Sequence, residues 1–213
     1  RDKELSPNTV RRHHDLLSAA LHAAVRHDVL LRSPTERVEP PRTTQTEIGY
    51  YGPSELKELY VLVQDTWLEV IVKLAGSLGL RREEICGLRW DCVDFQQRKI
   101  HICQARTAAG AVIVEKETKT RSSTRALYMT DDLYYLLKRE RARQAENRLR
   151  MGSLWKDTGL VAVDQRGRPY SPNAVSLAFT RFIRKHHLPK LTLHGLRHPY
   201  VKHTTKKYNS EKQ

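Results

Sequence analysis

The pattern of apolar positions predicts a helix near the start of the chain. Apolar residues recur at helical spacing from Val10 to Val25. Ser6 followed by Pro7 is typical of a helix start, with a capping hydroxyl and a proline in the first turn. We expect this helix to run to about Leu30. A single amphipathic helix cannot bury its own apolar stripe, so we also expect partner helices upstream, outside this sequence.

The next segment, 33–46, contains three prolines and has no apolar period, which predicts an extended linker and a domain boundary. Helical spacing returns from Ser54 to about Leu80, with a possible break near Asp65. The second part of this stretch is mostly apolar, so we expect it to be buried. A glycine turn then leads into a short helix with Arg81 at its start.

Strand patterns come next, separated by turn residues. They predict one small antiparallel sheet with the strands Val93–Phe95, Lys99–Cys103, Ala111–Glu115 and Arg125–Met129. The polar stretch 116–123, between the last two strands, is typical of a solvated hairpin tip. It could also extend a lysine toward the backbone of a bound polymer.

Two further helices are predicted after the strands. One runs from Asp131 to about Leu149, and the other runs from Ser171, again as a capping serine, to about His187. A short apolar run, Leu160–Val163, lies between them and is expected to be buried. The predicted fold is therefore mainly α with a small antiparallel β-sheet, in the α+β class.

The net charge of the chain predicts a polyanionic partner. Lysine and arginine total 38 of the 213 residues against 24 acidic residues, which gives a formal charge of +14. Such an excess is expected for a protein that binds nucleic acid. No segment reaches the roughly 18 apolar residues of a transmembrane helix, so we expect no membrane association.

The three cysteines are odd in number and include no Cys-x-x-Cys pair, which indicates neither a disulfide framework nor a zinc site. We expect free thiols in a reducing cytoplasm. The sequence begins without a methionine and without a signal-peptide pattern, which we interpret as a fragment or a processed product.

Candidate chemistry centres on His194 and Arg197, three positions apart in an apolar frame. The histidine can accept a proton near neutral pH, and the guanidinium of the arginine is a charged group with several hydrogen-bond donors. Together they could bind a phosphate group. The same spacing also occurs by chance on surface helices. Arg81 directly follows apolar residues, so it could hold an anion; alternatively, Arg81 or Arg82 could form an internal ion pair with Glu84.

Taken in order, the motifs resemble the tyrosine recombinases, the phage-integrase type of site-specific DNA recombinase. The similar features, spread from Leu5 to His198, are Ser-Pro-Asn-Thr-Val, a Pro-Pro linker, Gly-Leu-Arg-Arg-Glu-Glu-Ile-Cys-Gly-Leu-Arg-Trp, Glu-Thr-Lys-Thr-Arg-Ser-Ser and His-Gly-Leu-Arg-His. The resemblance implies that residues 1–38 are the C-terminal part of a helical core-binding domain and 39–48 a linker. It also implies that residues 49–213 are a catalytic domain, truncated before its nucleophile segment.

The resemblance also implies roles for particular residues. In this family a tyrosine attacks a DNA phosphodiester while two arginines stabilise the phosphoryl oxygens, and Arg81 and Arg197 match these arginines. Lys119 matches the lysine that protonates the leaving 5′-oxygen, and His194 matches the histidine that assists proton transfer. Glu84 matches a supporting acidic position. The family uses neither metal nor ATP, so no cofactor is implied.

The end of the sequence departs from the family pattern. Only 16 residues follow Arg197, without a Leu-Gly-His segment, and Tyr200 and Tyr208 are too close to Arg197 to match the nucleophilic tyrosine. The nucleophile is therefore unassigned. We expect a protein that binds double-stranded DNA and holds the scissile phosphate without cleaving the strand, with weakened assembly as a homo-oligomer on DNA.

Two other functions stay open at this point. One is a non-catalytic DNA-binding regulator derived from an integrase. The other is an unrelated basic RNA-binding protein, which would bind structured RNA more strongly than duplex DNA at equal salt.

Overall fold

The computed structural model describes residues 5–43, 49–109, 112–117 and 125–197. The chain folds as two units, Arg1–Ile48 and Gly49–Gln213. Lys119, Tyr200 and Tyr208, for which the sequence made predictions, lie outside the described residues.

The first unit contains the predicted helix, α1 (Pro7–Arg26). Its predicted cap is confirmed, because the Ser6 hydroxyl accepts a hydrogen bond from the Thr9 N–H at 3.2 Å. The helix ends four residues before the predicted Leu30. Asp28 takes a left-handed conformation (φ 56°), and the Val29 N–H turns back to the Ala24 carbonyl at 2.9 Å, which closes the helix.

The prediction of an extended linker from residue 33 is wrong at its start, where a 3-10 turn forms, η1 (Pro34–Arg37). The Thr35 hydroxyl donates to the Ser18 hydroxyl of α1 at 3.1 Å, and both Ser33 and Thr35 are buried. A proline fixes φ at a value that suits the first position of a turn as well as an extended chain, so the prolines alone could not separate the two.

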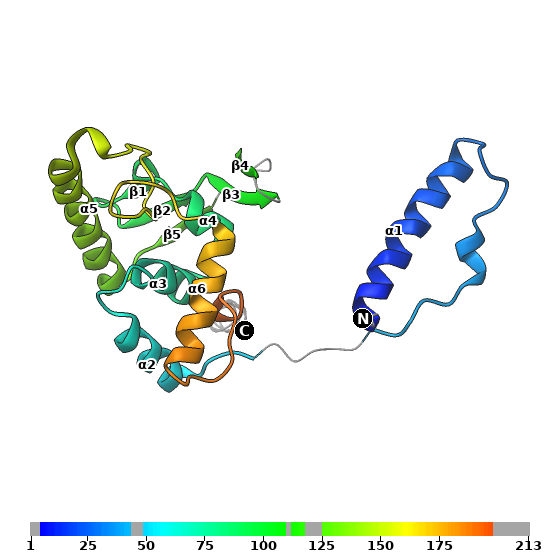
Figure 1. The fold of residues 1–213 in the computed structure, drawn as a ribbon, viewed down its shortest axis with the longest axis horizontal. Helices are drawn as coiled ribbons and strands as arrows, with labels where there is room; N and C mark the ends of the chain where they lie inside the picture. The colour runs from blue at the N-terminus through cyan, green and yellow to red at the C-terminus, as the bar shows by residue number, and fades with distance from the viewer. Residues whose placement is uncertain (1–4, 44–48, 110–111, 118–124, 198–213) are drawn as a thin grey trace, which may run out of the picture. The chain divides into compact units, whose positions relative to one another are not determined.

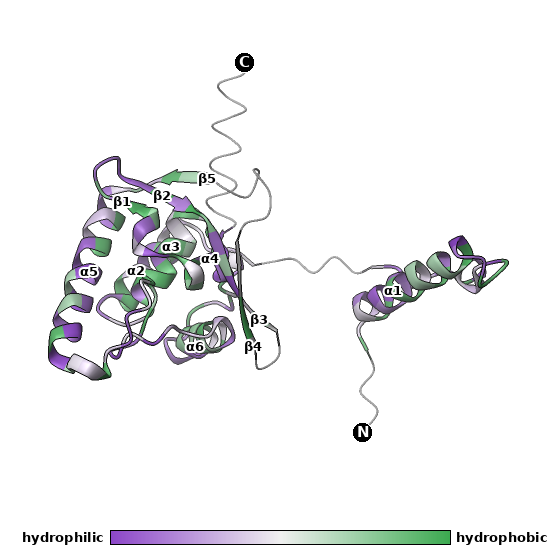
Figure 2. Ribbon diagram, turned by 90° about the horizontal axis from the view of Figure 1, so that it is seen from above, coloured by the Kyte–Doolittle hydropathy of each residue, from purple (hydrophilic) through white to green (hydrophobic). Residues whose placement is uncertain are grey.

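The second unit is built around a buried helix. The predicted break near Asp65 is confirmed, because α2 (Pro53–Val63) and α3 (Glu69–Leu78) are separate helices. Eight of the ten residues of α3 are buried. In Figure 1, α3 lies inside the unit, with α2 and α5 on its flanks, and Figure 2 shows α3 as mostly hydrophobic. Helices α2 and α5 both pack against it.

A tight turn connects α3 to the next helix. Gly79 ends α3 in a left-handed conformation (φ 62°), which glycine adopts without steric cost. The short helix α4 (Arg82–Gly87) then begins with Arg81 as its N-cap residue, as the sequence predicted. A 3-10 turn, η2 (Trp90–Cys92), leads from α4 into the strands.

The strands form two antiparallel sheets and not the single sheet predicted. One has the order β1 (Val93–Asp94), β2 (Lys99–Ile102), β5 (Arg125–Tyr128); the other is the pair β3 (Gln104–Ala109) and β4 (Val112–Glu117). In the first sheet Ile100 lies opposite both Val93 and Leu127.

Strand β3 was missing from the sequence prediction because its residues, Gln-Ala-Arg-Thr-Ala-Ala, lack the run of β-branched and aromatic residues that marks a strand. It is held instead by α4. The Gln104 side-chain amide donates to the Gly87 carbonyl at 3.1 Å, and a Cβ on Gly87 would lie only 3.0 Å from the Arg106 backbone nitrogen. Glycine at this position therefore allows the β3–β4 pair to pack closely against α4.

Two long helices complete the second unit, α5 (Asp131–Met151) and α6 (Pro172–Lys185), with a 3-10 turn η3 (Gly152–Leu154) after α5. The Thr130 hydroxyl caps α5 through the Leu133 N–H at 3.4 Å. Ser171 occupies the N-cap position of α6 as predicted, but its hydroxyl accepts no capping hydrogen bond. Among the helices described, none combines the length and the apolar character that crossing a membrane requires.

The last element described is a 3-10 turn, η4 (Gly195–Arg197), which carries Arg197. It packs against α3, and Leu196 is fully buried in the apolar core. The core therefore reaches directly to the residue that precedes Arg197.

Truncation of this anchor is expected to destabilise the second unit. Leu196→Ala should lower the free energy of unfolding by about 2–5 kcal/mol, because it leaves a cavity in a fully packed site. Urea denaturation measures the change. Leu177→Ala, at a leucine of α6 that is 52% exposed, is the control and should change the stability by less than about 0.5 kcal/mol. Equal effects of the two substitutions would contradict the packing described.

Candidate functional site

The segment that carries His194 and Arg197 is positioned by its leucines. Leu191, Leu193 and Leu196 are buried in the core, whereas His194 is exposed and Arg197 is half-buried. The Arg197 N–H donates to the His194 carbonyl at 3.2 Å, which closes the turn of η4. The leucines of this segment thus anchor the turn in the core, and its polar residues lie toward the surface.

Arg197 is fixed to the end of α3. Its Nε donates to the Gly79 carbonyl at 2.7 Å, and Gly79 stands two residues before Arg81. Burial lowers the pKa of Arg197, and the charge of the nearby Arg81 lowers it further. The structure therefore brings together Arg81 and Arg197, as expected from the sequence.

A buried carboxylate holds Arg81 in place. The Glu84 side chain is only 5% exposed and accepts two hydrogen bonds from Arg81, from the backbone N–H at 2.7 Å and from Nη1 at 2.9 Å. The Arg81 side chain itself remains 57% exposed. The internal ion pair that the sequence left open is present, yet more than half of the Arg81 side chain is exposed.

Sequence reasoning missed a third arginine at this site. Arg125, the first residue of β5, donates from Nη1 and Nη2 to the two oxygens of Glu84, at 3.1 and 2.9 Å. Glu84 thus joins α4 to the three-stranded sheet. The only sequence signal was an arginine at the start of a predicted strand, which does not indicate a partner 41 residues away.

The pKa of Glu84 reflects this arrangement. Burial by itself raises the pKa of a carboxyl group, but the hydrogen bonds and positive charge of Arg125 and Arg81 outweigh burial and lower the pKa of Glu84 below its usual value. Glu84 is therefore an ionised carboxylate at neutral pH.

Positive charge remains in excess around Glu84. Removal from water lowers the pKa of Arg197, and the charges of Arg81 and Arg125 lower it further, while Glu84 acts in the opposite direction. The guanidinium groups of Arg81 and Arg125 thus contact this carboxylate, and that of Arg197 is close enough to be affected by its charge. An anion bound next to Arg81 and Arg197 would relieve their repulsion, and a phosphate offers the oxygens that planar guanidinium groups bind well.

The neighbouring Arg82 has a different role. It pairs with Glu83 at 2.6 Å, and not with Glu84, and it donates to the Ser176 hydroxyl of α6 at 2.9 Å. These contacts fasten α4 to α6. Because its donors are directed into the fold, Arg82 serves the packing of the site and not its open face.

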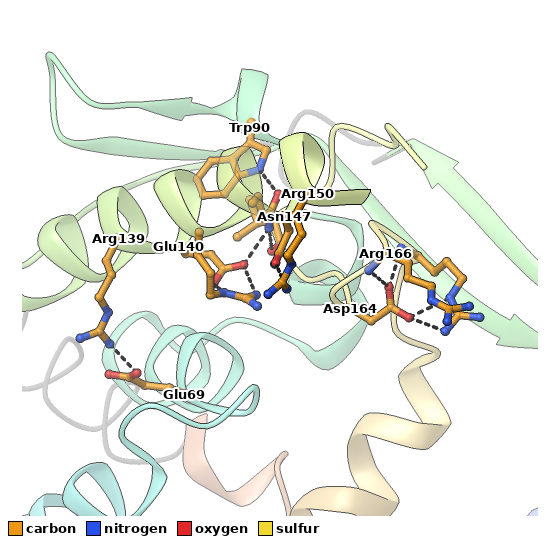
Figure 3. A network of polar contacts seen from close by, with 12 residues as sticks. Glu69, Trp90, Arg139, Glu140, Asn147, Arg150, Asp164 and Arg166 are labelled. Atoms are coloured by element: carbon orange, nitrogen blue, oxygen red, sulfur yellow. Dashed lines mark hydrogen bonds and ion pairs between the residues drawn. The ribbon is translucent and has the colours of Figure 1, made fainter. Parts of the chain in front are cut away.

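A second set of polar contacts lies along α5 (Figure 3). Arg139 pairs there with the buried Glu69 of α3 at 2.5 Å. These residues border a pocket of about 1100 Å³. Its wall includes the rings of Trp67 and Tyr170, which are tilted relative to each other with centroids 4.4 Å apart. The pocket lies by the first turn of α3, whereas Gly79 and Arg81 follow its last turn. The arginine site is therefore separate from this pocket.

The donors of the arginine site suit an anion and not a metal ion. Guanidinium groups are permanently protonated and carry no lone pair for coordination. In the part of the chain that the structure describes, no three His, Cys, Asp or Glu side chains are grouped so that they could hold a metal ion.

Comparison with known proteins matches this chain to one family. A family model described as the phage integrase family matches residues 52–208. A tyrosine recombinase XerC-like protein of Caldanaerobacter subterraneus subsp. tengcongensis is 24% identical over 92% of this chain and 55% of its own length. The ICEBs1 integrase of Bacillus subtilis is 25% identical over 87% of this chain and 50% of its own length. The chain thus spans about half the length of these two relatives.

Solved structures share the fold. The Tn1549 transposon integrase in complex with transposon right end DNA has a TM-score of 0.79 at 21% identity, over 95% of this chain and 68% of that chain. A lambda integrase dimer bound to a COC' core site has a TM-score of 0.61 at 16% identity, over 90% of this chain and 64% of that chain. At these identities the likeness concerns the fold alone.

The lowered pKa of Glu84 predicts a pH-dependent contribution to stability. The folded-state pKa lies below the unfolded value of 4.5, so the carboxylate stabilises the fold above that value, and the contribution disappears as the pH falls through the folded-state pKa. Urea denaturation of wild type and Glu84→Gln should give the full difference in unfolding free energy at about pH 6 and a much smaller one near about pH 3. A difference that does not change with pH would show that charge is not involved.

Proposed function

The chain belongs to the phage integrase family of tyrosine recombinases, and from this we propose that it holds the scissile phosphate of double-stranded DNA in site-specific recombination. Arg81 and Arg197 bind the phosphoryl oxygens through their guanidinium groups. His194 assists proton transfer on the attacking side, and Lys119 supplies the proton to the leaving 5′-oxygen.

The observation that carries the proposal is the convergence of arginines that are distant in sequence. Arg197 reaches the Gly79 carbonyl, and Arg81 stands beside it on the buried carboxylate of Glu84. A phosphodiester would neutralise an excess of positive charge that the fold itself leaves unpaired. The formal charge of +14 supports a polyanion as the partner.

The remaining assignments rest on family membership. We propose residues 1–38 as part of a core-binding domain, 39–48 as a linker and 49–213 as catalytic-domain sequence. Assembly as a homo-oligomer on DNA is proposed by analogy with lambda integrase, which was solved as a dimer and as a tetramer bound to DNA. The attacking tyrosine is left unassigned.

Phosphate contact can be tested by neutralising one phosphate at a time. A duplex enriched from a random pool by the intact chain is synthesised with a methylphosphonate at each position in turn, and affinities are measured at several salt concentrations. We expect one position per strand at which neutralisation weakens binding most, by about tenfold for a lost charge-assisted contact. Arg81→Ala and Arg197→Ala should remove the sensitivity at that position and reduce the salt slope by about one each.

Arg148→Ala is the matched control for this experiment. Arg148 is an exposed arginine of α5 paired with Asp157, so its removal lowers the net charge by the same amount outside the proposed site. It should leave the position dependence unchanged. Unaltered position dependence in Arg81→Ala and Arg197→Ala would refute the proposal, as would tighter binding to structured RNA than to duplex DNA at equal salt.

A further inference from the structure

We propose that Arg125 is a positioning residue of this site, which engages the carboxylate of Glu84 so that the guanidinium of Arg81 stays open and charged toward a phosphate. The inference rests on the proposed function and adds a residue that does not itself touch the phosphate. Three features support it: the hydrogen bonds of Glu84, the charge balance around that carboxylate and the placement of Arg125 on β5.

The acceptor capacity of Glu84 is used up. A carboxylate has about four lone-pair sites for hydrogen bonds. Arg125 takes two through its Nη groups, the Arg81 backbone N–H takes a third, and Arg81 Nη1 takes the fourth. Arg81 can therefore give Glu84 only one guanidinium nitrogen.

The consequence for Arg81 is a set of uncommitted donors. Among the described residues, its guanidinium has one hydrogen bond, from Nη1 to Glu84, and its side chain is 57% exposed. The Nε and Nη2 groups are left for a ligand. Without Arg125, both carboxylate oxygens of Glu84 could bind the Arg81 guanidinium. Its remaining N–H groups would then no longer be available to a ligand.

Charge balance gives the same result. One carboxylate beside one arginine makes a neutral pair, which attracts an anion weakly. With Arg125 also bound to Glu84, the pair becomes a group of net charge +1, and Arg197 adds a further positive charge nearby. Arg125 thus maintains the attraction for an anion although its own donors face Glu84.

Strand β5 fixes Arg125 in this orientation. Arg125 lies opposite Ile102 of β2, and the side chains alternate along the strand so that Ala126 and Tyr128 are exposed while Arg125 and Leu127 are half-buried. The Arg125 side chain is 31% exposed. An arginine on a paired strand is held more precisely than one on a loop, which suits a positioning role.

The test uses inorganic phosphate as the probe and the intact chain as the protein. Phosphate is titrated while NMR follows the Nε–H groups of Arg81 and Arg197. Arg125→Gln should weaken phosphate affinity by about tenfold and shift the free-state Arg81 Nε–H resonance, because Glu84 now binds both ends of the Arg81 fork. Arg125→Lys keeps the charge without the fork and should fall between wild type and Arg125→Gln.

The double variant Glu84→Gln/Arg125→Gln separates positioning from direct contact. If Arg125 acts by engaging the Glu84 charge, removal of that charge restores phosphate affinity to within about threefold of wild type. If Arg125 instead binds phosphate directly, the double variant stays as weak as Arg125→Gln, and the inference is refuted. Wild-type affinity in Arg125→Gln would refute it as well.

Two further variants complete the design. Arg139→Gln removes an arginine from another buried carboxylate, that of Glu69 (Figure 3). It should leave the phosphate affinity unchanged. Thermal unfolding measures how much stability this substitution costs. Arg81→Ala tests the proposed function itself. If Arg81→Ala binds phosphate as well as wild type, the proposed function fails; if only the Arg125 results fail, the proposed function stands without this inference.

Discussion

One buried carboxylate organises the site of this protein. Glu84 lies inside the second unit at 5% exposure, where an ionised group is stable only when it is fully hydrogen-bonded. Arg81 and Arg125 meet that need from two different elements, a helix start and a strand start. The requirement of one buried charge thus connects α4 to β5, and the surplus positive charge of this connection faces outward. Under the proposed function, the contacts that stabilise the buried Glu84 also provide the positive charge that attracts an anion.

The sequence predicted the helices well because their signals are local. The cap at Ser6, the break near Asp65 and the buried second half of that stretch all follow from spacing and turn chemistry, and the structure confirms them. The sheets were predicted less well. Strand β3 has small and polar residues and is stabilised by its contact with Gly87 of α4, which no pattern within the strand can reveal. The same limit hid the turn η1, whose evidence is a contact between Thr35 and Ser18.

The residues of the candidate site also differ in whether the sequence could predict them. Arg81 and Arg197 could be named from the sequence because each lies in a motif that resembles a known family, and the structure places them near each other through Gly79. Arg125 has no such motif, and its role depends on the geometry of Glu84, which only the fold defines. The prediction for Lys119 falls outside the described residues and stays a prediction.

The left-handed turn at Gly79 limits where residues can be inserted into or deleted from this sequence. The carbonyl of Gly79 holds Arg197, and Arg81 comes two residues later, so the end of α3 positions both Arg81 and the anchor of Arg197. Each residue added to a helix rotates the later residues by about 100° around the helix axis. A single insertion or deletion within α3 would therefore rotate Gly79 and Arg81 together, away from Arg197, which η4 holds in place through the buried Leu196. Gly152, at the end of α5, is exposed and has open space around it, so variation in length should collect there and avoid α3.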